Sequence, residues 1–91
     1  MAEALIFRIH AVQRMSQRRI SVENVRQALE TGHTIENYPD DFPYPSSLIL
    51  GWVESRPLHV VVAHAPEKKI VITVYEPDPA QWTSDFKIRK P

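Results

Sequence analysis

Three side chains suited to phosphate chemistry recur at four-residue spacing near the start of the sequence. They are His10, Arg14 and Arg18, and in a helix residues four apart lie on one face. A guanidinium forms paired hydrogen bonds with phosphate oxygens, and an imidazole can give or accept a proton near neutral pH. The stripe therefore indicates a site for a phosphate-bearing substrate. A solvated helix face is the alternative interpretation.

A second candidate is His59, which lies in the most apolar predicted strand. Leu58, Val60 and Val62 alternate with it, so if they pack on the helices, His59 faces the other side of the sheet. Tyr75 ends the last predicted strand and shares that face only in some registers. A histidine and a tyrosine together suit acid–base chemistry and base stacking. The alternative is a half-buried strand histidine satisfied by a backbone carbonyl.

The charges of the chain cancel overall but are arranged in blocks. Eleven Lys and Arg residues balance eleven Asp and Glu residues, which argues against a polycation that coats nucleic acid. Residues 8–19 nevertheless hold four arginines, including Arg19, and no acid, and the tail carries Lys87, Arg89 and Lys90. If the fold brings these ends together, the protein has one basic face. For the tail alone, phosphate contact and a solubilising terminus remain open alternatives.

Composition excludes several classes of protein. There is no cysteine, the four histidines are scattered, and two glycines cannot form a glycine-rich phosphate loop, so we expect no metal and no cofactor. No apolar run spans a membrane, so we expect no membrane partner. The acidic Glu3 and the lack of a long apolar segment after it favour a cytoplasmic protein. Ninety-one residues are enough for one domain, residues 1–91.

Periodicity predicts helices first and strands afterwards. A helix is expected over residues 7–18 and a second over 22–31, with Ser21 as N-cap and Gly32 as a left-handed C-terminal residue. Strands are expected over residues 33–38, 47–55, 58–64 and 69–75, a proline-rich loop over 39–45, and an extended segment or last strand over 81–90. This order predicts an α+β domain, in which two N-terminal helices pack on one face of a four-stranded antiparallel sheet. The other face would be free to hold a site.

The chain also resembles a known family over roughly residues 9–89. The motifs are His10 and Arg14 with Arg18-Arg19-Ile20-Ser21, then residues 35–38, 57–61 and 70–75, and finally Pro77, Trp82 and Arg89. They are similar to those of small bacterial proteins of unknown function that are often found beside zinc-finger antitoxin-like proteins. That family distantly resembles the RelE/ParE-like fold, which includes the barnase, EndoU and colicin groups.

The resemblance implies a RelE-like toxin of a type II toxin–antitoxin system. Such a protein would be a metal-independent endoribonuclease in which the 2′-hydroxyl attacks the neighbouring phosphate. Its expected partners are RNA, including ribosome-associated mRNA, and a cognate antitoxin protein, with a zinc finger as one form. The catalytic residues implied are His10, Arg14, His59 and Tyr75, with His10 or His59 as general base or acid and Arg14 stabilising the phosphate. The two basic segments supply the candidates for RNA and phosphate binding, which are Arg18, Arg19, Lys87, Arg89 and Lys90.

Two non-enzymatic alternatives stand beside this hypothesis. The first is a non-catalytic module of the same fold that binds protein or nucleic acid, with Phe42, Tyr44 and Trp52 as anchors. The second is a domain that forms a homodimer through an edge strand.

Overall fold

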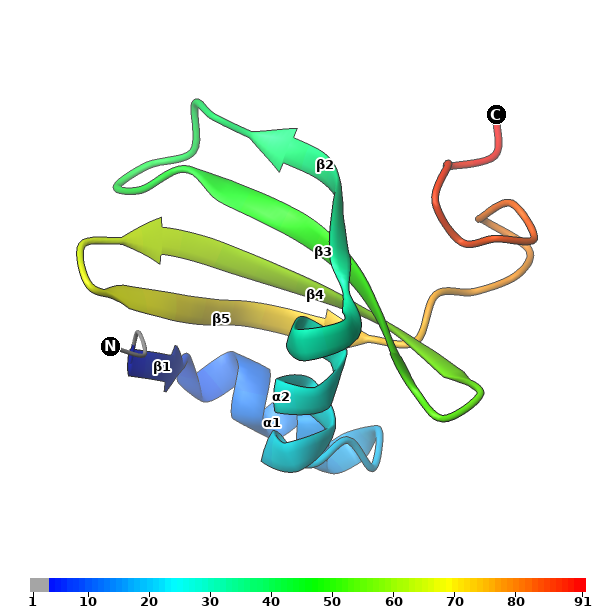
Figure 1. Cartoon of the computed structure of the whole chain (residues 1–91), viewed down its shortest axis with the longest axis horizontal. Helices are drawn as coiled ribbons and strands as arrows, with labels where there is room; N and C mark the ends of the chain where they lie inside the picture. The colour runs from blue at the N-terminus through cyan, green and yellow to red at the C-terminus, as the bar shows by residue number, and fades with distance from the viewer. Residues whose placement is uncertain (1–3) are drawn as a thin grey trace.

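A computed structural model describes residues 4–91, which form five strands and two helices. The elements in chain order are β1 (Ala4–Phe7), α1 (Ile9–Gln17), α2 (Val22–Thr31), β2 (His33–Tyr38), β3 (Ser46–Val53), β4 (Arg56–Ala65) and β5 (Lys68–Tyr75). The strands form one sheet in the order β1-β5-β4-β3-β2, and Figure 1 shows the two helices together on one side of it. Residues 1–3, including Glu3, lie outside the described residues. No helix within residues 4–91 is long and apolar enough to cross a membrane.

The predicted four-stranded antiparallel sheet is wrong, although the protein is an α+β domain. Ala4–Phe7 forms a strand instead of leading into the helix, and it pairs parallel to β5, with Ala4 opposite Lys68. The other three strand pairs among the described residues are antiparallel, so the sheet is mixed and has five strands. A four-residue strand is too short to show a period, and its partner lies at the other end of the chain. The sequence pattern therefore missed it.

Both glycines of the chain lie where α2 approaches β3. A Cβ atom on Gly51 would lie 1.9 Å from the carbonyl oxygen of Ala28, and one on Gly32 would lie 2.5 Å from the same atom. Gly32 has φ −88° and ψ 169°, so the predicted left-handed cap is wrong and the residue serves close packing instead. Ser21 is the N-cap of α2, as predicted. Its side chain accepts from the Asn24 amide, and the Asn24 side chain accepts from the Ser21 amide.

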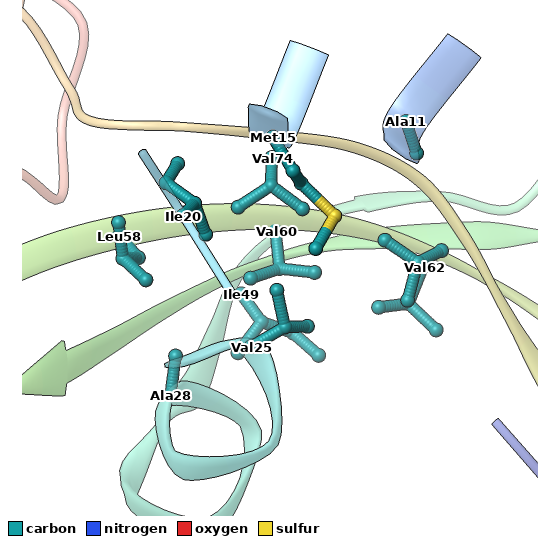
Figure 2. Packing of buried hydrophobic residues seen from close by; sticks show 11 residues of the cluster. Ala11, Met15, Ile20, Val25, Ala28, Ile49, Leu58, Val60, Val62 and Val74 are labelled. Atoms are coloured by element: carbon teal, nitrogen blue, oxygen red, sulfur yellow. The ribbon is translucent and has the colours of Figure 1, made fainter. Parts of the chain in front are cut away.

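The hydrophobic core lies between the helices and one face of the sheet. Leu58, Val60 and Val62 of β4 point into it, as predicted, and meet Met15 of α1 and Val25 of α2. Figure 2 shows these side chains converging from the helices and from the sheet. Because alternate residues of a strand point to opposite faces, His59 must point away from this core.

A β-bulge in β5 breaks the predicted alternation of that strand. The register places Val61 opposite Thr73 but Val62 opposite Val71, which leaves Ile72 as the extra residue. Val71 and Val74 therefore both enter the helix-side core, where strict alternation put them on opposite faces. On the C-terminal side of the bulge, Tyr75 pairs directly with His59, and the two rings share the other face of the sheet.

The C-terminal segment after Tyr75 covers one end of that second face. Its only strand-like pairing among the described residues is a bridge between Trp82 and Arg89. Trp82 is buried, and the Phe86 ring contacts the Trp52 ring of β3 edge-on. Figure 1 shows the segment as an orange-to-red loop beyond the end of β5. The second face is therefore not simply free, as expected from the sequence, because the tail of the chain closes it around His59.

Candidate active site

The candidate site is built around His59, whose side chain is completely buried on the second face of the sheet. The strand register supplies its neighbours, since His59 lies opposite Leu50 of β3 on one side and opposite Tyr75 of β5 on the other. The Tyr75 and Trp82 rings both meet the imidazole edge-on, at centroid distances of 5.2 and 4.4 Å. The ring is thus held between the last strand and the tail.

Hydrogen bonds fix the tautomer of His59. Its Nε2 atom lies 2.8 Å from the carbonyl oxygen of Phe86. A carbonyl can only accept, so Nε2 carries the proton. The other nitrogen, Nδ1, lies 3.2 Å from the Tyr75 hydroxyl and accepts its proton in the neutral ring. The result is a chain from the Phe86 carbonyl through the imidazole to the phenol of Tyr75.

The environment keeps both members of this pair neutral. Burial lowers the pKa of His59 below its usual 6.5, with a smaller lowering by the Arg89 charge, while the Phe86 carbonyl acts in the opposite direction. Burial also raises the pKa of Tyr75 above its usual 10.0. At neutral pH the imidazole therefore has a lone pair on Nδ1 for the Tyr75 proton. A neutral imidazole next to a hydroxyl is the arrangement found where a histidine acts as a base.

Phe86 reaches this position through an unusual backbone conformation. Its φ is 62°, in the left-handed region that side-chain-bearing residues rarely adopt. The turn around it is held by hydrogen bonds from the Phe86 amide to the Thr83 carbonyl, at 2.8 Å, and from the Thr83 amide to the Ile88 carbonyl, at 2.9 Å. The tail thus presents the Phe86 carbonyl to the buried imidazole.

Arg89 connects the tail to the other edge of the sheet. Its guanidinium lies 4.6 Å from the centre of the Trp82 ring, and its Nε atom lies 3.2 Å from a carboxylate oxygen of Glu36 on β2. Burial opposes ionisation of Glu36, but hydrogen bonds from Tyr38 and Arg89 outweigh it, so the pKa of Glu36 is below its usual 4.5. Burial and the hydrogen bond to Glu36 raise the pKa of Tyr38. Arg89 is therefore charged and held in one orientation, and its guanidinium is paired with the Glu36 carboxylate.

A cavity of about 500 Å³ opens beside Tyr75. Three arginines and two acids line it, together with two aromatic residues and a glutamine. The lining residues are Arg18, Arg56, Tyr75, Glu76, Asp78, Gln81, Trp82 and Arg89. Cavities of this volume hold small molecules or single nucleotides, and aromatic and guanidinium groups suit stacked bases and phosphates. The cavity therefore joins the His59–Tyr75 pair to a set of anion-binding groups.

Two of these arginines tie the end of α1 to the sheet. Arg18 is the C-cap residue of α1 and donates to the Val74 carbonyl at 2.8 Å. Arg56, at the start of β4, donates to the carbonyls of Arg18 and Arg19 at 3.0 and 3.2 Å and forms an ion pair with Glu76. Arg56 was missed from the sequence, where Arg56-Pro57 only marks the end of a strand. Its position opposite the basic end of α1 depends on the β3–β4 turn.

The structure brings four of the predicted site residues together and leaves five apart. His59 and Tyr75 form the central pair, and Arg18 and Arg89 line the same cavity. The remaining five are exposed and are not among the residues that line the cavity, namely His10 and Arg14 on α1, Arg19 after it, and Lys87 and Lys90 in the tail. The predicted stripe of α1 thus reaches the site only through Arg18. Within residues 4–91, no group of three or more His, Asp and Glu side chains is arranged to hold a metal ion.

One comparison with known proteins gives a family for this chain. The model of the family described as "Domain of unknown function (DUF4258)" matches residues 7–76. No curated protein and no solved structure matches the chain significantly. The family match ends directly after Tyr75 and Glu76, so the segment that carries Trp82, Phe86 and Arg89 lies beyond it.

Proposed function

The chain belongs to the DUF4258 family, and from the geometry of its own site we propose that it is a metal-independent endoribonuclease. The observation that carries the proposal is the Tyr75 hydroxyl, which is hydrogen-bonded to Nδ1 of a buried, neutral His59 and borders a cavity lined by three arginines. This combination offers a proton acceptor and charge stabilisation in one place. When the 2′-hydroxyl of RNA attacks the neighbouring phosphate, the reaction is promoted by a group that accepts the hydroxyl proton and by cations that stabilise the charge on the phosphate.

The proposed reaction uses the hydrogen-bonded chain as a proton relay. The 2′-hydroxyl of the substrate attacks the adjacent phosphorus while its proton passes to the Tyr75 oxygen and the Tyr75 proton passes to Nδ1 of His59. The bond between phosphorus and the 5′-oxygen breaks, and that oxygen takes a proton from solvent. The products are a 2′,3′-cyclic phosphate and a 5′-hydroxyl. The Phe86 carbonyl stabilises the imidazolium through Nε2–H.

Arg18 and Arg89 take the role of phosphate stabilisation in this proposal. Guanidinium groups neutralise the negative charge that develops on the phosphoryl oxygens, and they do so most strongly from fixed positions. Arg18 is fixed by the Val74 carbonyl, and Arg89 by Glu36 and the Trp82 ring. Trp82 also gives the cavity an aromatic wall. The raised pKa of Tyr75 is compatible with the relay, because the phenol gives up its proton only as it receives another.

The wider biological role forms the second part of the proposal. We infer that the protein is the toxin of a type II toxin–antitoxin system, distantly related to RelE/ParE-like ribonucleases, which acts on RNA and is neutralised by a cognate antitoxin. The support is the family resemblance described from the sequence together with the cavity chemistry. Induced expression is expected to arrest growth, and the variant Tyr75→Phe is expected to relieve the arrest.

The direct test is cleavage of single-stranded RNA by the purified protein in excess EDTA. We expect fragments ending in a 2′,3′-cyclic phosphate, and no cleavage of the same RNA with 2′-deoxy substitution at the cut site. Tyr75→Phe is expected to lower the rate by about 10²–10⁴-fold, the usual contribution of a general base. Tyr44→Phe is the matched control, since Tyr44 lies in the loop before β3, outside the cavity lining. An inactive wild-type protein, or equal rates for the two variants, would reject the proposal.

A binding module without catalysis is the second candidate, and one observation favours it. Each arginine in the cavity already has a partner within the chain, and His59 is fully buried behind Tyr75. Such a site would hold an RNA or protein ligand without reacting. The same assay separates the candidates, because this one predicts RNA binding that survives Tyr75→Phe and leaves the RNA intact.

A further inference from the structure

The free edge of β1 has the features of a docking site for another strand. β1 is the terminal strand of the sheet, and it pairs with β5 on one side only. The amides of Ala4 and Arg8 donate to the Glu67 and Val71 carbonyls at 3.3 and 3.1 Å. Because backbone groups alternate in direction along a strand, the amides of Leu5 and Phe7 point away from the sheet. The edge therefore presents unpaired donors, and a strand edge of this kind accepts an extended peptide.

Apolar side chains lie beside this edge on both faces of the sheet. On the face away from the helices, Ile6 is 42% exposed. On the helix side, α1, which follows β1 directly, exposes Ile9 (72%) and Val12 (47%). On the helix-covered face, a second cavity of about 210 Å³ has Leu5 and Leu29 as its apolar walls and Arg26, Glu30 and Lys69 around them. An added strand next to β1 would direct alternate side chains toward this cavity and toward Ile6.

The charge next to the edge selects the kind of strand that fits. Residues 8–19 carry four arginines and no acid. Arg8, the N-cap residue of α1 directly after β1, is exposed. Arg26 adds a cation at the second cavity, where Glu30 is the one acid lining it. A second copy of this chain would bring like charges together at such an edge, which is unfavourable. An acidic strand would instead bring its carboxylates near the guanidiniums of Arg8 and Arg26.

We propose that the outer edge of β1 binds an acidic, extended segment of a partner protein, with alternating apolar side chains, which extends the sheet by one strand. This surface is the outer edge of β1, which lies on the side of β5 away from β4. The proposal does not depend on the proposed ribonuclease activity. The cavity beside Tyr75 plays no part in it.

The test uses a synthetic heptapeptide as probe, acetyl-Glu-Val-Glu-Val-Glu-Val-Glu-amide, with the full-length protein. Hydrogen exchange measured by NMR is expected to show new protection of the Leu5 and Phe7 amides. The same peptide with lysine in place of glutamate, and the acidic peptide with alternate amides N-methylated, are expected to protect neither. Arg8→Glu is expected to weaken binding by about fivefold, the upper range for one exposed charge pair.

Ile6→Glu and Val22→Glu form a matched pair of variants, because each replaces an apolar side chain that is 42% exposed. We expect Ile6→Glu to abolish binding of the acidic peptide and Val22→Glu to leave it unchanged, with both proteins folded by their NMR spectra. Absence of protection at Leu5 and Phe7, equal binding of the basic peptide, or protection of these amides by single-stranded RNA would overturn the proposal. So would a dimer that Ile6→Glu dissociates, since the occupant would then be a second copy. RNA cleavage is read separately, so its failure in the wild-type protein would reject the ribonuclease and not the docking edge.

Discussion

The hydroxyl of Tyr75 lies 3.2 Å from Nδ1 of His59, while the other nitrogen of that ring is bound to the Phe86 carbonyl. These two hydrogen bonds join three consecutive parts of the chain: β4, β5 and the tail. They give the imidazole one tautomer and leave its basic nitrogen facing a phenol at the cavity wall.

The free energy of unfolding is expected to decrease as pH falls, because His59 is then forced to take up a proton. Its pKa in the folded protein is lowered, by burial first, from the usual 6.5. Between the lowered pKa of the folded protein and the usual pKa of the unfolded chain, the unfolded chain therefore binds more protons. Stability is lost as pH falls below about 6.5. Melting temperatures measured from pH 8 to pH 5 should show this loss. His59→Gln should flatten the profile in this window, whereas the exposed His64→Gln should retain it. An unchanged profile in His59→Gln would contradict the assignment.

Protonation of Glu36 should lower stability in a separate, more acidic pH window. The pKa of Glu36 is lowered below 4.5 because the hydrogen bonds from Tyr38 and Arg89 outweigh the effect of burial. Its contribution to stability is complete above the unfolded value and disappears as pH falls through the folded value. Between pH 5 and pH 3 the melting temperature should therefore fall less for Glu36→Gln than for the wild type. Glu23→Gln, on the exposed first turn of α2, is the control and should behave as the wild type.

Cleavage of RNA is expected to depend on the cavity arginines and not on the exposed residues of α1. Arg18→Ala and Arg89→Ala should lower the rate by about 10²–10³-fold, the usual loss when one group that stabilises developing charge is removed. His10→Ala and Arg14→Ala should keep most of the activity, because neither residue lines the cavity. Rates on a defined RNA decide the question. Dependence on His10 at the level of Tyr75 would show that the reaction centre lies elsewhere.

Arg89 is expected to hold the tail in place over His59. Its contacts with Glu36 and the Trp82 ring are exposed and cost little to lose, so Arg89→Ala should change the free energy of unfolding by at most about 1 kcal/mol. Local opening of the tail should increase more than global unfolding does. Hydrogen exchange should accelerate at the Lys90 amide, which donates to the Gln81 carbonyl at 2.8 Å. Lys87→Ala is the control because Lys87 is exposed and lines no cavity. Equal exchange in the two variants would remove Arg89 from this role.

Gly51→Ala is expected to destabilise the fold strongly. A methyl group there would meet the Ala28 backbone at 1.9 Å, so α2 must move away from β3 and open the core between them. We expect a loss of about 3 kcal/mol or more, at the upper end for an overpacked interior. Urea unfolding of Gly51→Ala beside Ser55→Ala, an exposed turn residue, provides the measurement. A loss below about 1 kcal/mol would show that the contact between helix and strand yields easily.

Local sequence patterns determined most of the secondary structure. The Ser21 cap, the alternation of Leu58, Val60 and Val62, and the proline-rich loop all depend on near neighbours, and each is found as predicted. The strand β1 and the bulge at Ile72 are different. β1 is defined by a parallel partner at the far end of the chain, and the bulge by an offset of one residue between paired strands. Neither leaves a periodic signal.

For the site, the sequence supplied the kinds of side chain, and the tertiary structure decided which of them meet. Histidine, tyrosine and arginine could be recognised as groups for acid–base and phosphate chemistry from their types alone. Whether Tyr75 shares a face with His59 depended on the register of β4 and β5, because one residue of slip turns every side chain to the other face. Arg18, Arg56 and Arg89 share a cavity because a helix end, a strand start and the tail converge there. Only the folded chain sets that convergence, since it depends on contacts between segments dozens of residues apart.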